Sequence, residues 1–324
     1  MSGAMSQIQS DPSTLRPAFM TPQKLLPDEK CSLGCPILDC CMGGGIPCNS
    51  ITEIVAESGS GKTQFCLQLS LRAQLPPFLG GLSASSLYLY TEFPFPTRRL
   101  HQLSSALQSQ YPQIFVNNYD PCDGIFLQSV NTADQLLDIM PQVESFLENS
   151  KTRLPVRVIV IDSMAALFRA EFDNTASDLI RRSSLFFKIS GKLKEFAKRF
   201  NLVVLVTNQV MDVVDSGEGA NEMRIGNLNG MYSSGRRICP ALGLSWANCV
   251  NSRLFLSKDE YESGSVGGGE KGFWESTDKK RRWLLLLVFS SSTRPALSDG
   301  CTSIPVRKEE NKAADRESGG SSLN

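Results

Sequence analysis

Residues 50–63 read SITEIVAESGSGKT, and this stretch decides the fold. Residues 50–55, which are rich in the β-branched residues Ile, Thr and Val, are predicted to form a strand. Residues 56–63 differ by one letter from the phosphate-binding pattern G-x-x-x-x-G-K-S/T, because Ala56 stands in place of the first glycine. The pattern of residues 62–74 favours a helix. A strand, a glycine-rich loop and a helix in this order are the context that a phosphate-binding loop requires.

The loop has the residue types that hold phosphate. Its backbone N–H groups can surround an anion at the N-terminus of the following helix, where the helix dipole favours negative charge. Lys62 is predicted to reach the β- and γ-phosphates and the Thr63 hydroxyl to ligate Mg²⁺, so ATP and Mg²⁺ are the predicted cofactors. The residues predicted to bind the nucleotide here are Glu57, Ser58, Gly59, Ser60, Gly61, Lys62, Thr63 and Gln64. The alternative is a Gly/Ser turn that precedes Lys-Thr by chance.

Ala56 raises the question of whether the loop works. It lies where the strand turns into the loop. Alanine fits there if the backbone φ is negative, whereas a positive φ would cost about 1 kcal/mol or somewhat more. We therefore expect Ala56 to weaken the loop far less than the loss of Lys62 would.

Apolar runs and amphipathic stretches alternate along the chain. Strands are predicted at 50–55, 86–90, 124–128, 156–161 and 202–207, and helices at 62–74, 97–108, 133–148 and 176–199. Strands of near-continuous Val, Ile and Leu between helices indicate a parallel sheet that is covered on both faces. The predicted fold class is an α/β P-loop NTPase core with a mainly parallel β-sheet flanked by helices. Further strands are expected from residue 254 and at 283–289.

Polar residues follow three of these strands, at the sheet edge where the phosphate loop lies. Asp162 ends the run VIVID and is predicted to hold Mg²⁺ through water, or else to cap the next loop. Glu92 is predicted to polarise the water that attacks the γ-phosphate, unless it is an exposed loop glutamate. Asn208 and Gln209 can hydrogen-bond a γ-phosphate and pass its presence to the next loop, or can be ordinary polar loop residues.

Composition narrows the class of protein. The chain has 324 residues with 33 basic and 33 acidic side chains, so no overall basic field indicates nucleic acid. The ten cysteines show no disulfide or zinc spacing, and we expect reduced thiols in an intracellular protein. No apolar window is long enough to span a membrane, so no membrane partner is predicted.

The chain divides into three parts by composition. Residues 1–30 are predicted to be a disordered N-terminal arm, 31–289 an ATPase core and 290–324 a disordered C-terminal tail. Within the core, residues 211–240 form a long loop that is either functional or disordered, and 257–282 form a flexible insertion. The insertion ends in KKRR at 279–282, which is either a nuclear import signal or a basic turn before a strand.

The loop, Glu92, Asp162 and Gln209 occur in an order and spacing that resemble the RecA-type recombinase ATPases. Stretches similar to the family, and in places to a eukaryotic recombinase paralogue, are SLGCPILD (32–39), GGGIPCNSITEI (43–54), YTEFPFPTRRLHQL (90–103), IDSMAALFRAEFDN (161–174) and PALGLSWANCVNSR (240–253). The resemblance implies a RecA-like core, a nuclear location and a part in homologous recombination repair of DNA double-strand breaks and crossover intermediates.

The resemblance also implies roles for single residues. It makes Glu92, Lys62 and Gln209 catalytic, places Mg²⁺ at Thr63 and Asp162, and places Arg99 near the adenine. It assigns DNA binding to two loops, with Arg169, Arg181, Arg182, Arg224, Tyr232, Arg236 and Arg237 as the contact residues. Arginines for phosphates and an aromatic ring for stacking suit a single strand, although a solvated loop is the alternative. The implied partners are single-stranded or branched DNA, another recombinase paralogue in a heterodimer and the strand-exchange recombinase.

The sequence departs from the family in three places. Only about 30 residues precede the predicted core, where the family has a small helical domain. No clear Phe-x-x-Ala segment is present, Phe19 being a poor candidate, so hetero-oligomers are expected rather than self-polymerisation. After residue 289 the family's Pro-rich turn and last strands give way to a polar stretch, as an altered reading frame or a splice variant would produce.

Two functions of different class follow from these observations. The first is a DNA-dependent ATPase that acts within a paralogue complex. The second is a nucleotide-bound scaffold that hydrolyses little ATP and assembles recombination partners. A P-loop kinase of small molecules is a third option, and the long loop after Gln209 argues against it.

Overall fold

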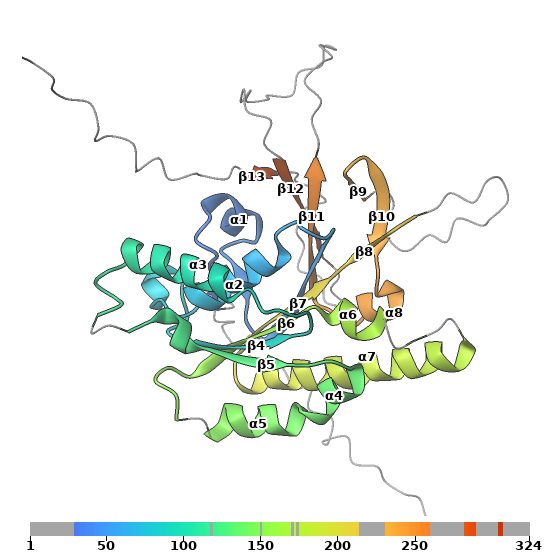
Figure 1. The fold of residues 1–324 in the computed structure, drawn as a ribbon, viewed down its shortest axis with the longest axis horizontal. Helices are drawn as coiled ribbons and strands as arrows, with labels where there is room; N and C mark the ends of the chain where they lie inside the picture. The colour runs from blue at the N-terminus through green and yellow to red at the C-terminus, as the bar shows by residue number, and fades with distance from the viewer. Residues whose placement is uncertain are drawn as a thin grey trace, which may run out of the picture.

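An eight-stranded sheet forms the centre of the computed structural model, which describes residues 29–116, 119–149, 151–169, 172, 175–213, 231–259, 282–289 and 304–306 (Figure 1). The strand order is β13-β12-β11-β3-β7-β6-β4-β5. The strands are β3 (Ser50–Ala56), β4 (Ser85–Tyr90), β5 (Ile125–Ser129), β6 (Val156–Asp162), β7 (Val203–Asn208), β11 (Ser252–Asp259), β12 (Arg282–Phe289) and β13 (Ile304–Val306). Neighbours from β11 to β5 are parallel, whereas β12 and β13 pair antiparallel. The predicted α/β fold with a mainly parallel sheet is confirmed.

Helices cover both faces of the sheet (Figure 1). They are α1 (Pro36–Cys41), α2 (Lys62–Arg72), α3 (Thr97–Gln110), α4 (Ala133–Asp138), α5 (Met140–Asn149), α6 (Met164–Arg169), α7 (Ala176–Arg199) and α8 (Gly243–Ala247), with short 3-10 turns η2 (Pro77–Leu79) and η3 (Pro121–Gly124). Alternate residues of β6 pack against the helices on opposite faces of the sheet. Val158 and Val160 pack with α2 and α3, and Ile159 and Ile161 pack with α4 to α8. Each fully buried side chain of this kind stabilises the fold by roughly 1.5–3 kcal/mol.

Helix α7 shows how the sequence sets the length of an element. The Thr175 hydroxyl caps its N-terminus by accepting a hydrogen bond from the backbone N–H of Asp178 at 3.2 Å. Phe186, Ile189, Leu193 and Phe196 recur at helical spacing and are buried. The bounds of α7 are those predicted from the sequence.

The predicted helix at 133–148 is wrong as a single element, because it is divided into α4 and α5 at Ile139. Pro141 lies at the start of α5 and has no backbone N–H with which to continue α4. The sequence pattern is apolar at helical spacing on both sides of this break, so periodicity alone did not reveal it.

The structure also differs from the predicted domain boundaries. Glu29 and Lys30, assigned to the disordered arm, belong to the folded part: the Glu29 carboxylate lies 2.5 Å from Arg157, and strand β1 (Lys30–Cys31) pairs with β2 (Ile46–Pro47). Residues 1–28 lie outside the described part of the chain. At the other end, β13 falls within the predicted tail, where two β-branched residues flank a proline that only an edge strand tolerates.

The predicted loop at 211–240 is in part a small sheet. Strands β8 (Val210–Asp212), β10 (Arg236–Pro240) and β9 (Tyr232–Ser233) form it in that order, and all pairs are antiparallel. Residues 214–230 lie outside the described ranges, as do residues 260–281 of the predicted insertion. Among the described helices, none is long and apolar enough to cross a membrane.

Candidate nucleotide-binding site

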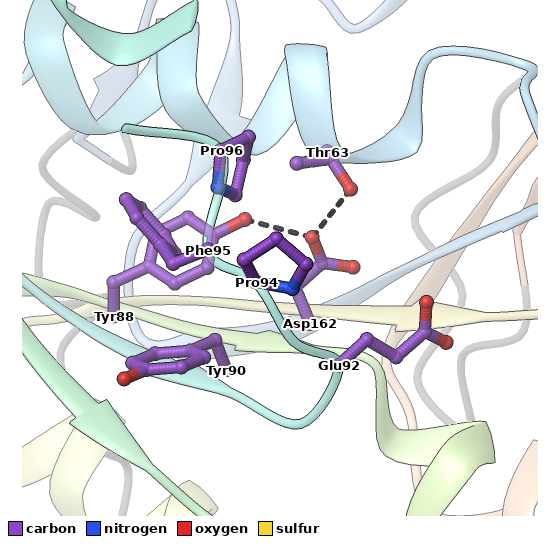
Figure 2. A pocket seen from close by; sticks show the side chains of 8 residues that line it. All are labelled: Thr63, Tyr88, Tyr90, Glu92, Pro94, Phe95, Pro96 and Asp162. Carbon is purple, nitrogen blue, oxygen red and sulfur yellow. Dashed lines mark hydrogen bonds between the residues drawn. The ribbon is translucent and has the colours of Figure 1, made fainter. Parts of the chain in front are cut away.

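The carboxyl ends of β3, β4, β6 and β7 meet at one edge of the sheet, beside a cavity of about 330 Å³ (Figure 2). The cavity is lined by Thr63, Tyr88, Tyr90, Glu92, Pro94, Phe95, Pro96 and Asp162. Three of the predicted site residues therefore lie around one space. Ligands of open parallel sheets bind at this edge.

The phosphate loop has the backbone geometry that its glycines predict. Gly59 and Gly61 have φ values of 69° and 91°, which glycine adopts without steric penalty. Ala56 is not among the residues with positive φ; it is buried and pairs with Leu256 of β11. The substitution of alanine for the usual glycine therefore introduces no backbone strain.

Three features of the loop fit a bound phosphate. Helix α2 begins after Gly61, and no side chain caps its N-terminus. Its first backbone N–H groups point at the phosphate loop. The Ser60 hydroxyl is buried and has no hydrogen-bond partner among the described residues. A Cβ built on Gly61 would meet no atom within 4 Å, so the mouth of the loop is open. An anion at a helix N-terminus is stabilised by such donors.

Lys62 holds its ammonium group at the mouth of the loop. Its Nζ donates to the carbonyl oxygen of Ala56 at 2.8 Å and to that of Glu57 at 2.9 Å. These contacts fix the direction of a long side chain. A positive charge in this position is suited to phosphate oxygens.

Three hydroxyl groups orient the Asp162 carboxylate. Its Oδ2 accepts from Thr63 Oγ1 at 2.7 Å and from the Tyr88 hydroxyl at 2.8 Å, as Figure 2 shows, and its Oδ1 accepts from Thr207 Oγ1 at 2.6 Å. Burial raises the pKa of Tyr88 well above its usual value, so this hydroxyl keeps its proton. Hydroxyl and carboxylate oxygens are the ligands that Mg²⁺ prefers. Sequence reasoning missed Tyr88 and Thr207, although a polar side chain in an apolar strand was the available signal.

Glu92 and Gln209 are in contact, as their shared sheet edge predicts. Gln209 Nε2 donates to Glu92 Oε1 at 3.1 Å, and Arg169 donates to Gln209 Oε1. Glu92 and Arg169 are exposed. The structure thus joins the predicted catalytic carboxylate, through one amide, to the first predicted DNA loop.

Arg99 and Gln64, both predicted to bind the nucleotide, also lie together. Arg99 Nε donates to Gln64 Oε1 at 2.6 Å, and its Nη1 donates to Gln102 at 3.0 Å. Arg99 is exposed at the start of α3. A planar guanidinium that two amides hold in place can stack on an aromatic base.

Glu57 behaves differently from the other loop residues. Its carboxylate accepts from Ser233 Oγ at 2.9 Å, Ser234 Oγ at 2.7 Å and Arg236 Nη2 at 2.5 Å. Burial raises the pKa of Glu57, but the hydrogen bonds from these residues outweigh burial and hold it below its usual value. The Glu57 side chain is therefore hydrogen-bonded to the β9–β10 hairpin, and a nucleotide would contact the backbone of Glu57 instead.

The predicted DNA-binding arginines of the first loop differ in exposure. Arg181 is exposed, pairs with Asp134 and lies 5.3 Å from the centre of the Phe172 ring. Arg182 is half-buried and donates to the Ala241 carbonyl at 3.2 Å. Burial lowers the pKa of Arg182. Arg182 thus packs against the protein, whereas Arg169 and Arg181 face solvent.

The predicted residues of the second loop are divided in the same way. Tyr232 is 59% exposed, and Arg237 is half-buried. Arg236 forms ion pairs with Glu57 and, at 3.0 Å, with Asp212. Arg224 lies outside the described residues.

A separate group of metal-ligand residue types lies between α3 and η3. His101, Asp120 and Cys122 have ligand atoms within 4.8 Å of one another. Asp120 Oδ1 accepts from the Cys122 backbone N–H and from Ser104 Oγ, each at 2.9 Å. The first bond caps the η3 turn and the second joins it to α3, so Asp120 has a structural role.

The phosphate loop lies at the carboxyl edge of a parallel sheet, and Thr63 beside it is hydrogen-bonded to Asp162. This arrangement defines a P-loop NTPase core of the RecA type. The sequence model of the Rad51 family matches residues 29–230, and the chain belongs to this family.

Three relatives show how far the similarity extends. The chain is 60% identical over 234 residues to the DNA repair protein XRCC3 homolog of Arabidopsis thaliana, which covers 72% of this chain and 77% of that protein. It is 34% identical over 242 residues to mouse DNA repair protein XRCC3, covering 74% and 66% of the two chains. It is 32% identical over 210 residues to the DNA repair and recombination protein RadA of Metallosphaera sedula, covering 65% and 61%. The chain thus spans just under two thirds of the mouse and archaeal relatives.

Proposed function

We propose that this protein is an XRCC3-like DNA repair protein that binds ATP with Mg²⁺ and acts in homologous recombination. Membership of the Rad51 family implies nucleotide binding, and the names of its relatives support a role in repair. The observation that carries the proposal is the Asp162 carboxylate, which Thr63, Tyr88 and Thr207 orient beside the open phosphate loop.

Each residue at the sheet edge has a part in this proposal. Bound ATP with Mg²⁺ would supply a phosphoanhydride bond and charge for the neighbouring groups to respond to. Lys62 binds phosphate oxygens, and Thr63 and Asp162 hold the metal. Arg99 lies against the base. Glu92 orients water, and Gln209 links Glu92 to the second loop.

The DNA contacts are proposed for the exposed groups at the same edge. Arg169 and Arg181 face solvent, and the Tyr232 ring offers a stacking surface. Arg237 belongs to the same hairpin. Single-stranded or branched DNA is the proposed ligand. The proposed partners are a second recombinase paralogue, in a heterodimer, and the strand-exchange recombinase, and the proposed location is the nucleus.

A second candidate is a scaffold that holds ATP and hydrolyses it little. One observation favours it: Glu92 Oε1 already accepts a hydrogen bond from Gln209, so one of the two oxygens of this carboxylate is engaged with the protein. In the first candidate, nucleotide binding separates the two side chains. In the second, they stay together and the nucleotide keeps a partner's surface in shape.

The test measures binding of a fluorescent ATP analogue and of a single-stranded oligonucleotide by the full chain. We expect Mg²⁺-dependent nucleotide binding and tighter DNA binding when ATP is present. Lys62→Ala should weaken nucleotide binding by about tenfold or more, since it removes a charge-assisted contact. Lys192→Ala is the matched control, because Lys192 is an exposed lysine of α7 that pairs with Glu195.

Glu92→Gln separates the two candidates. An ATPase should lose turnover and keep nucleotide binding, whereas a scaffold should show no change in either partner assembly or the low rate of hydrolysis. Nucleotide binding that is equal in the wild type and Lys62→Ala would contradict both candidates.

A further inference from the structure

The segment from Asn208 to Ala241 is held at both ends by the strand and loop that carry the phosphate site. At its start, Asn208 Nδ2 donates to Glu53 Oε1 of β3 at 2.7 Å. At its end, the β9–β10 hairpin reaches Glu57 of the phosphate loop. The two ends also meet each other, because the Ala241 N–H donates to the Gln209 carbonyl at 2.9 Å.

The hairpin is built to present donors to one point. Ser234 and Gly235 connect β9 to β10 with φ values of 49° and 71°. Two left-handed residues make the tight turn that suits the twist of an antiparallel pair. This turn brings the hydroxyls of Ser233 and Ser234, and the guanidinium of Arg236, to the Glu57 carboxylate.

The contact is buried on one side and exposed on the other. The Glu57 side chain is 7% exposed, whereas that of Arg236 is 56% exposed. A buried carboxylate needs its donors, because an unpaired charge out of water is costly. The arginine, by contrast, can return to water with little loss. The serine hydroxyls therefore keep the hairpin on the Glu57 carboxylate, whereas the Arg236 guanidinium can leave it for solvent.

The same residue also touches the phosphate-binding lysine. Lys62 Nζ donates to the Glu57 carbonyl oxygen at 2.9 Å, so the ammonium group that would hold a phosphate is bonded directly to the Glu57 backbone. The Glu57 backbone faces Lys62, and its side chain faces the hairpin. A continuous set of short contacts thus runs from the phosphate site to Arg236.

We propose that Glu57 is a positioning residue that couples nucleotide binding to the β9–β10 hairpin, in addition to the contact that Gln209 makes with Glu92. In this scheme Arg236 fastens the hairpin to Glu57 and does not bind DNA phosphate. The inference rests on the proposed binding of nucleotide, and it goes beyond it by naming a second physical connection between that site and the segment after β7.

The experiment measures amide hydrogen exchange of residues 232–240 in the full chain, with and without Mg²⁺-ATP, together with the affinity for a fluorescent ATP analogue. The test variant is Ser233→Ala/Ser234→Ala, which removes two hairpin donors and leaves the phosphate loop intact. Glu57→Gln tests the carboxylate itself. Asp212→Asn is the matched control, because it removes the other partner of Arg236 and not the link to Glu57.

We expect Mg²⁺-ATP to slow exchange in the wild-type hairpin by about fivefold or more, a typical size for coupling between sites. In the serine variant this slowing should fall below about twofold, while nucleotide affinity stays within about twofold of wild type. Asp212→Asn should keep the wild-type response. If the double variant does not fold, Ser234→Ala alone gives the same comparison at a half-buried position.

Four results would overturn the inference. If the wild type binds nucleotide and the hairpin does not respond, or the serine variant responds as the wild type does, this inference fails and the proposed function stands. If nucleotide affinity falls in parallel with the response, Glu57 only supports the loop. If the wild type binds no nucleotide, the proposed function fails as well, and the absent binding signal identifies that case.

Discussion

Two glutamates four residues apart, Glu53 in β3 and Glu57 in the phosphate loop, each pair with an arginine at 2.5 Å, and the two pairs differ in what surrounds them. The Glu53 and Arg253 side chains are 0% and 5% exposed, inside the sheet between β3 and β11. The Glu57 pair lies at the sheet edge, where Arg236 is 56% exposed. The inner pair is sealed from water, and the outer pair can open.

The difference follows from the cost of burying charge. Separating two buried charges leaves each without water, which is expensive. Arg253 Nη2 is already buried without a partner among the described residues, so the guanidinium finds neither another acceptor nor solvent when Glu53 is lost. Only one member of the outer pair is buried. The same glutamate–arginine pairing is therefore a rigid support inside the sheet and a contact that can open at its edge.

The largest effect is expected from breaking the inner pair. Glu53→Ala leaves Arg253 buried and unpaired, so the free energy of unfolding should fall by about 3–5 kcal/mol in urea denaturation. Asp134→Ala, which breaks the exposed pair with Arg181, is the control and should lose less than about 1 kcal/mol. Equal losses in the two variants would show that Glu53 and Arg253 are not sealed from water.

A smaller effect is expected between the two glutamates, at Ala56. Ala56→Gly restores the usual letter of the pattern but removes a buried methyl group and stiffness from β3. We expect a loss of about 1–2 kcal/mol in the free energy of unfolding. Nucleotide affinity should stay within about twofold, because Ala56 needs no positive φ. Affinity that rises by about tenfold would mean that alanine does hinder the loop.

The outer pair should contribute little to global stability. Arg236→Ala removes one of three donors to Glu57, and the arginine is more than half exposed, so solvent already screens the pair. The free energy of unfolding should fall by less than about 1 kcal/mol. Amide exchange in the hairpin should nevertheless become faster than in Asp212→Asn. A loss as large as that of Glu53→Ala would remove the distinction between the two pairs.

The smallest effect is a pH dependence confined to the hairpin. The pKa of Glu57 is lower in the folded protein than its usual 4.5, so its contribution to stability is complete above about 4.5 and is lost as pH falls through the lower, folded value. Protection of the hairpin amides, taken as the ratio of the intrinsic to the observed exchange rate at each pH, should therefore be steady above that pH and fall in more acidic solution. Glu57→Gln should show no such step, and Asp212→Asn should keep it.

The sequence predicted the elements around the site well because their signals are local. Strand β3, the loop and helix α2 follow from a stretch rich in β-branched residues, two glycines and Lys-Thr. Helix α7 has a cap and a buried stripe within its own sequence. The division of 133–148 was missed because Pro141 falls where apolar spacing continues on both sides. The strand at 304–306 was missed because three residues carry almost no pattern.

The candidate site was predicted in part for the same reason. Asp162 ends β6, Glu92 follows β4, and Lys62 and Thr63 begin the helix after β3, so a parallel sheet gathers all four at one edge. Tyr88 and Thr207 were not predicted, because they act through a carboxylate that only strand order brings to them. The family resemblance assigned Arg182 and Arg236 to DNA binding, and the sequence could not show that each also bonds to atoms of the protein itself.

The sequence by itself determined that this chain forms a P-loop core and which lysine, threonine and aspartate make up the candidate nucleotide site, since a motif and the period of apolar residues are local properties. Only the tertiary structure decided which residues the side chain of Glu57, the second residue of the loop motif, contacts. Glu57 meets Ser233 and Arg236 across 176 and 179 residues of chain, and no pattern in the sequence encodes that meeting. It depends on β3 lying next to β11, and on where the hairpin packs against them.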